Sequence, residues 1–239
     1  MRWPSPPLAT WTLIDQAVLS FGTFVLNIVL ARHLPISHYG GYAMFVGIIS
    51  IMQVVCGTLL YYPLSVRGSL LAEAELRRLI VTGLGLTAIL GVPLAVFLAI
   101  LTELAIAPGL FLPAFSVLLA SQLQEAVRRG LLAGCRHREA VLGDAISYLG
   151  QGALVILVVR QFDLDLASAF YAMAATSLAA AGVQWIQLAL TGAAPFPLVE
   201  TFRDFWTLGI WSLSSNVLNI VRGHSIPWLL SFVCGQATA

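Results

Sequence analysis

Polar side chains recur at helical spacing inside a long apolar stretch near the N-terminus. Gln16, Ser20, Thr23 and Asn27 are four, three and four residues apart. At about 100° per residue they fall within a stripe of about 60° on one helix face, and Asp15 lies just off its edge. Such a stripe on a membrane helix is expected to face a cavity or another helix rather than lipid. Cavity lining and hydrogen bonding between helices both stay open as interpretations.

A later apolar stretch repeats this spacing with Asp144, Tyr148 and Gln151, again four and three residues apart. These three residues are therefore further candidates for a substrate cavity. Asp144 lies only a few residues into its stretch, so a solvated helix end is the alternative interpretation for that carboxylate.

A third group of polar residues lies at the end of the apolar stretch at roughly 106–127, which precedes the one that contains Asp144. Glu125 precedes Arg128 and Arg129 by about one helical turn and can pair with either, as in a structural network at a helix end. The functional alternatives are a cytoplasmic gate or a basic rim that meets anionic headgroups.

Arg222 lies well inside the last apolar stretch, with Pro227 and more apolar residues beyond it. An arginine within the membrane needs a partner, water or an anionic ligand, and its guanidinium can bind phosphate bidentately. The alternative is a helix that ends near Val221 and leaves Arg222 at the outer interface.

The elements that must position these residues are about seven apolar stretches. Most reach the ~20 residues that an α-helix needs to span the hydrocarbon core of a bilayer. They lie at roughly 10–31, 40–63, 79–101, 106–127, 141–159, 166–190 and 206–233. Hydrophobic residues make up 59% of the 239 residues and charged residues 10%, whereas soluble domains carry about 25% charged residues. The sequence predicts an all-α polytopic membrane protein.

The arginines predict the orientation. The sequence has no lysine, so its 12 basic residues are all arginine. Nine fall on the N-terminal tail and the even-numbered loops, and three lie toward the other side. We therefore expect the N-terminus in the cytoplasm and a multi-pass location in the inner membrane. The nine are Arg2, Arg67, Arg77, Arg78, Arg128, Arg129, Arg136, Arg138 and Arg203, and the three are Arg32, Arg160 and Arg222.

Several classes of function are not favoured by the sequence. It contains no nucleophile elbow, Walker A loop, zinc-protease motif or dinucleotide fingerprint, so we expect no enzyme and no cofactor. His33 and His38 have the spacing of paired zinc ligands, but Pro35 separates them and nothing nearby completes a metal site. A net charge of +1 argues against a nucleic-acid partner.

A weak internal repeat suggests how the chain is divided. Residues 11–13 and 25–29 recur, with a short gap, as residues 206–208 and 217–221. We expect a six-helix lobe over 1–198, followed over 199–239 by an amphipathic connector and the first helix of a second lobe. The connector, residues 199–204, is expected to lie on the cytoplasmic surface.

Three groups of residues resemble the oligosaccharide flippases of bacterial polysaccharide biosynthesis. They are residues 15–16 with 30–35 and 39–40, the helix exit at 63–66, and Gln124-Glu125-x-x-Arg128-Arg129 followed by Asp144-x-x-x-Tyr148-x-x-Gln151. The flippases belong to the multidrug/oligosaccharidyl-lipid/polysaccharide exporter superfamily, which also includes the multidrug and toxin extrusion antiporters.

The resemblance implies two six-helix lobes that rock about a central cavity. It also implies a polyprenyl-diphosphate-linked oligosaccharide as substrate, with cavity arginines, here Arg222, meeting the diphosphate. The family has about 12 helices, so we expect a second lobe from a further segment, another polypeptide or a homodimer. Two alternatives are a cation-coupled drug antiporter that uses Asp15, and a non-transporting fragment that packs within a polysaccharide-assembly complex in the membrane.

Overall fold

A computed structural model describes residues 8–190 and 192–234, and every regular element in these ranges is helical. Within these ranges five helical segments have the length and apolar composition needed to cross a membrane, fewer than the roughly seven stretches expected from the sequence. They are Thr10–His33, Ile36–Gly68, Glu73–Ala105, His137–Gln161 and Leu166–Leu188. The chain is thus an all-α polytopic membrane protein, as the sequence predicts. Helices can span lipid because each satisfies its own backbone hydrogen bonds.

The helices agree with the expected stretches to within a few residues at most ends. Two short π-helical segments, η1 and η2, interrupt two of the rods. The elements are α1 (Leu8–His33), α2 (Ile36–Cys56), η1 (Gly57–Tyr61), α3 (Tyr62–Gly68), α4 (Glu73–Ala105), α5 (Phe111–Ala133), α6 (His137–Asp144), η2 (Ala145–Leu149), α7 (Gly150–Gln161), α8 (Leu166–Leu188) and α9 (Leu198–Cys234).

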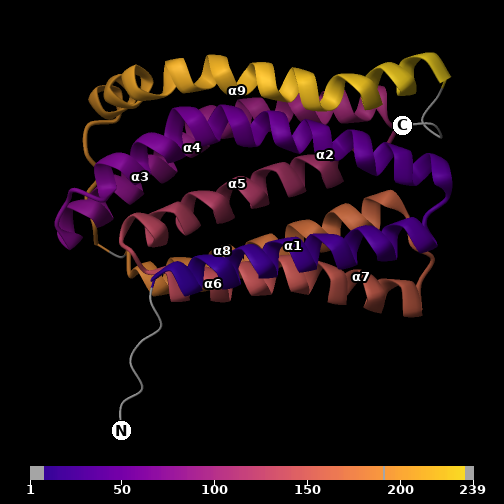
Figure 1. The fold of residues 1–239 in the computed structure, drawn as a ribbon, viewed down its shortest axis with the longest axis horizontal. Helices are drawn as coiled ribbons and strands as arrows, with labels where there is room; N and C mark the ends of the chain where they lie inside the picture. Colours follow the sequence, from indigo (N-terminus) through magenta and orange to yellow (C-terminus); the bar gives the residue numbers. More distant parts are fainter. Residues whose placement is uncertain (1–7, 191, 235–239) are drawn as a thin grey trace, which may run out of the picture.

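Helix α5 lies in the middle of the bundle. It packs against α4 on one side and α8 on the other, while α1 packs along the continuous rod formed by α6, η2 and α7. Figure 1 shows α9 along the opposite edge, beside α2 and α4. The polar side chains of α5 are therefore surrounded by protein, which explains how so central a helix can carry the polar residues Gln122, Gln124, Glu125 and Arg128.

One end of the bundle carries most of the arginines. The start of α1, the α3–α4 turn, the α5–α6 turn and the α8–α9 connection all lie at this end (Figure 1). Within the described side chains it holds the predicted cytoplasmic arginines from Arg67 to Arg203, whereas Arg32 and Arg160 lie at the opposite end. We call the first of these the arginine end.

The expected amphipathic connector at residues 199–204 is not a separate element. Helix α9 begins at Leu198, directly after Pro197, and continues without a break to Cys234. Its first turns are anchored to α3 by a bidentate pair from Arg67 to Asp204, with distances of 2.8 and 2.5 Å. The amphipathic pattern of these turns therefore arises because one face of α9 packs against the bundle and the other faces solvent. It does not indicate a helix that lies apart on the surface.

Helix α9 also packs closely on η1. A Cβ atom added at Gly209 would lie 3.0 Å from Leu59 Cα and closer still to Thr58 O, so only glycine permits this approach. The first turns of the predicted second lobe thus pack against helices of the first.

Candidate functional site

The centre of the candidate site is Arg128, which is buried in the middle helix of the bundle. Its exposed fraction is 9%. Nη2 donates to Asp15 Oδ2 at 2.6 Å, and Nε donates to Asp144 Oδ2 at 2.5 Å. The guanidinium thus joins α1, α5 and α6, which the sequence separates by up to 113 positions. We call Asp15, Glu125, Arg128, Arg129 and Asp144 the ionic cluster.

Glu125 completes this arrangement from the same helix as Arg128. Its two carboxylate oxygens lie 3.3 and 3.4 Å from Arg128 Nη1, and its Oε1 accepts from Arg129 Nε at 2.6 Å. The pairing expected within α5 is therefore present. The predicted helix-end network is only part of a larger cluster that also ties α5 to two other helices.

Arginine suits this position because its planar guanidinium presents several donors in fixed directions. A charge at membrane depth is costly unless it is paired. Asp144 is fully buried, so the alternative of a solvated helix end is wrong for that residue. That prediction was wrong because α1 and α8 pack against α6 and shield Asp144 from solvent. The position of Asp144 along its own helix does not reveal which other helices pack against it.

The ionic cluster holds more acid than base. Three carboxylates share two guanidinium groups, and Asp15 Oδ1 is buried without a hydrogen-bond partner in the described part of the chain. With all five groups ionised, one negative charge remains in excess. A proton or a cation would neutralise that excess.

Neutral polar side chains extend the cluster across the bundle. Gln124 Nε2 lies 3.5 Å from Asp144 Oδ1, and Gln124 Oε1 accepts from Ser147 Oγ at 2.9 Å. Ser147 in turn contacts Gln151 Nε2 at 3.5 Å and Ser177 Oγ at 3.4 Å. This polar chain links α5 to η2, α7 and α8.

The π-helical turn η2 presents part of this chain. A π-turn inserts an extra residue into a helix, often at a functional site. Gly22 of α1 lies against it: a Cβ atom added there would be 2.7 Å from Tyr148 C and O. The close approach of α1 and η2 brings Asp15 and Asp144 to one guanidinium.

A small cavity of about 140 Å³ lies beside the polar chain, between α1, α2, α5, η2, α7 and α8. Its polar walls include Thr23, Gln124, Glu125, Tyr148, Gln151 and Ser177. Ligand pockets for organic molecules measure about 300–1,000 Å³. The cavity is therefore large enough for an ion with a few waters and too small for a sugar.

The α1 stripe lies mainly on the outside of the bundle, and Thr23 also lines this cavity. Gln16, Ser20 and Thr23 are exposed and Asn27 is half-buried. Together with Tyr148 they line an open groove of about 580 Å³. Asn27, at one end of the stripe, donates from Nδ2 to Thr23 O at 2.8 Å within its own helix and accepts at Oδ1 from Tyr39 Oη of α2 at 3.5 Å. Hydrogen bonding between helices therefore applies to Asn27, while exposed Gln16 and Ser20 face the groove.

The structure thus sorts the candidates into two groups. Asp15, Glu125, Arg128, Arg129 and Asp144 form the ionic cluster, while the α1 stripe and Tyr148 line the outward groove. Thr23 and Tyr148 line the small cavity as well. Gln151 belongs to the polar chain beside the cluster. The side chain of Arg222 lies outside the described part of the structure.

Sequence reasoning did not select Ser147 and Ser177. Serines are frequent in membrane helices, where they bond to their own backbone, so residue type alone gave no signal. Ser147 does lie three residues after Asp144 and four before Gln151, which places it on the same helix face.

Comparison of the chain with protein-family models, with curated proteins and with solved structures returned no match.

Proposed function

We propose that this protein is one lobe of an alternating-access transporter that moves a polyprenyl-diphosphate-linked oligosaccharide across the bacterial inner membrane, with its N-terminus in the cytoplasm. One observation carries the transport part of the proposal. The polar stripe of α1 faces out of the bundle along a helix of membrane-spanning length. Lipid cannot satisfy these groups, so a second lobe is needed to enclose them in an aqueous cavity.

The substrate class rests on the resemblance to oligosaccharide flippases. The small cavity excludes a sugar, which leaves the outward groove of about 580 Å³ as the surface for a large substrate. A second copy of this chain or another polypeptide would supply the opposite wall. In either arrangement the ionic cluster joins three helices behind the groove.

Water accessibility tests the cavity directly. In a variant with Cys56, Cys135 and Cys234 changed to serine, we would introduce Ser20→Cys in the α1 stripe. The control is Ile89→Cys, which is exposed near the middle of α4 on an apolar face. A charged, membrane-impermeant thiol reagent is expected to modify the first variant in cells and leave the second unmodified. Equal protection of both cysteines would contradict the proposal.

Transport itself is tested with the full chain in vesicles that contain a fluorescent polyprenyl-diphosphate oligosaccharide. Movement of the lipid to the opposite leaflet, blocked by modification of Ser20→Cys and not by the same treatment of Ile89→Cys, is the expected result. If Ser20→Cys is labelled in cells but the lipid does not move in vesicles, the aqueous cavity stands and the assignment of the substrate is wrong.

The second candidate function is a cation-coupled antiporter. The excess carboxylate of the ionic cluster and the unpartnered Asp15 Oδ1 favour it. Proton-driven uptake of an organic cation that is abolished by Asp15→Asn, without lipid movement, would support this candidate over the flippase.

A further inference from the structure

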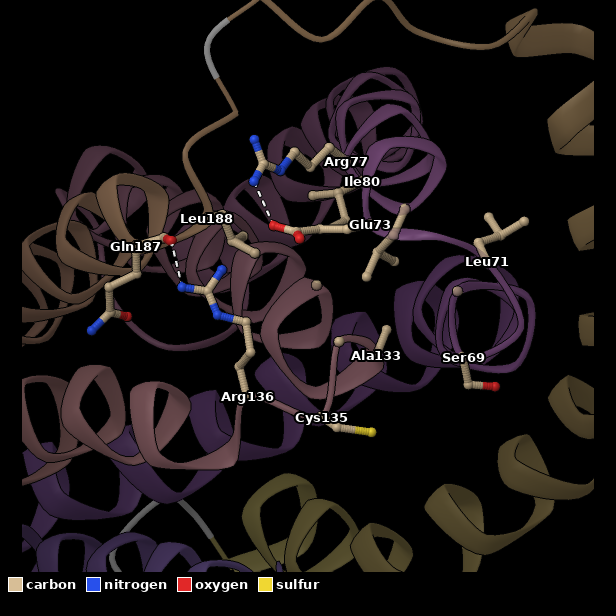
Figure 2. A pocket seen from close by; sticks show the side chains of 14 residues that line it. Ser69, Leu71, Glu73, Arg77, Ile80, Ala133, Cys135, Arg136, Gln187 and Leu188 are labelled. Carbon is tan, nitrogen blue, oxygen red and sulfur yellow. Dashed lines mark hydrogen bonds and ion pairs between the residues drawn. The ribbon is translucent and has the colours of Figure 1, made fainter.

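A second pocket lies at the arginine end of the bundle, away from the ionic cluster. It measures about 520 Å³ and lies between the end of α3, the start of α4, the end of α5 and the end of α8 (Figure 2). This volume is within the range of pockets that hold organic ligands.

The inner wall of the pocket is apolar. Leu76 and Ile80 of α4 and Leu188 of α8 line it. Gly130 of α5 permits the close packing of α4, because an added Cβ would lie 2.9 Å from Ile80 Cδ1. The pocket therefore offers hydrocarbon contacts at its base.

Charged side chains form its polar side. Arg77 Nη2 contacts Glu73 Oε1 at 2.5 Å, and Arg136 Nη2 donates to Gln187 O at 2.7 Å (Figure 2). Arg136 also pairs with Glu139. Two guanidinium groups, those of Arg77 and Arg136, thus line the same pocket and each holds a carboxylate, an arrangement that also suits a phosphate.

The turn after α5 holds Arg136 in place. Arg136 N bonds to Leu131 O at 2.9 Å, and Cys135 N bonds to Leu132 O at 3.0 Å. This is the hydrogen-bond pattern of a Schellman C-cap, and Cys135 occupies its left-handed position with φ 57°. The backbone therefore directs Arg136 toward α8 and the pocket.

The two arginines keep donors available for a ligand. Their side chains are 39% and 35% exposed, and exposed ion pairs contribute little net free energy. A phosphate can therefore compete with Glu73 for Arg77. An open groove of about 550 Å³, lined by Glu73, Arg77, Arg78 and residues 192–194, lies next to the pocket and widens the approach.

We propose that this pocket binds the phosphate headgroup of a membrane lipid, with Arg77 and Arg136 on the phosphate and the apolar wall on the start of the acyl chains. Basic pockets between membrane helices at the headgroup level bind anionic lipids in this way. Free inorganic phosphate could bind the same two arginines. It has no acyl chains, so it would make no contact with Leu76, Ile80 and Leu188 and would bind less tightly than the lipid.

Binding of a short-chain phosphatidylglycerol to the purified full chain in an uncharged detergent tests the proposal. Arg77→Gln is expected to weaken binding about tenfold, the value of one charge-assisted contact. Arg138→Gln is the matched control, because Arg138 is an exposed arginine at the same end that does not line the pocket. Equal effects of the two variants would overturn the proposal.

Two further measurements separate the proposal from a folding defect and from a free-phosphate site. Glu73→Gln removes the competing carboxylate and is expected to tighten binding, which a damaged fold cannot do. Weaker binding by this variant would count against the proposal. Inorganic phosphate is expected to bind far less tightly than the lipid, and equal affinity would overturn the lipid assignment.

Discussion

Arg128 and Arg77 each hold a carboxylate at 2.5 Å, yet their surroundings differ in every other respect. Arg128 is buried and joins three helices, whereas Arg77 is over a third exposed and pairs with Glu73 on its own helix. Removing one member of a buried pair leaves an uncompensated charge, while water replaces a lost exposed partner. The comparison shows that the contact distance alone does not indicate how much each ion pair contributes to stability.

The largest effect is expected from Arg128→Ala. This change leaves Asp15 and Asp144 buried and unpaired, and such losses cost about 3–5 kcal/mol. We expect a clear fall in the free energy of unfolding in mixed micelles, followed by helical circular dichroism. A loss no larger than that of an exposed arginine would remove the distinction between the two regions.

Replacing the whole buried group sharpens the comparison. The triple variant Arg128→Met, Asp15→Leu and Asp144→Leu removes the charges together, and apolar replacements of buried ion pairs are often neutral or stabilising. Glu125 keeps Arg129 as a partner. We expect the triple variant to unfold with a higher free energy than Arg128→Ala and to show no transport in the vesicle assay. Unimpaired transport would show that the cluster has no role in function.

Asp165 lies at the end of the bundle opposite the arginine end, and its replacement is expected to have an intermediate effect on the free energy of unfolding. Its Oδ1 accepts from Ser168 N at 2.8 Å, and the two residues form a capping box at the start of α8. Asp165→Ala is expected to lower the free energy of unfolding by about 1 kcal/mol. This loss should fall between those of Arg128→Ala and Arg77→Ala.

The hydrogen bonds with Ser168 lower the pKa of Asp165 below its usual value. A carboxyl whose pKa is lower in the folded state contributes stability above its unfolded pKa, near 4, and loses it as pH falls through the folded value. The stability difference between the natural protein and Asp165→Ala should therefore shrink below about pH 4. Asp165→Asn, which keeps a capping oxygen and cannot titrate, is the control.

The smallest effect is expected from Arg77→Ala. Its partner Glu73 is exposed, so water replaces the lost contact and the unfolding midpoint should not change within error. A large destabilisation would indicate that the arginine-end pocket is part of the structural core and would weaken its assignment as a ligand site.

The sequence was sufficient for the helices and for part of the site. The pairing of Glu125 with its neighbouring arginines was confirmed. That the polar face of α1 avoids lipid stays a prediction, because the structure shows only that this face lines an open groove. Residues 199–204, expected as a surface connector, are the first turns of the continuous helix α9. The amphipathic pattern could not show this, because it does not reveal whether the apolar face meets lipid or protein.

Hydropathy and the length of the apolar stretches by themselves determined an all-α polytopic membrane protein, since the bilayer requires each helix to satisfy its own backbone. Helical spacing also determined which side chains share a face. Only the tertiary structure decided which helix each face meets. It brought Asp15 and Asp144 to Arg128 across 113 and 16 positions and turned the α1 stripe outward, because contacts between distant helices depend on packing that no local pattern encodes.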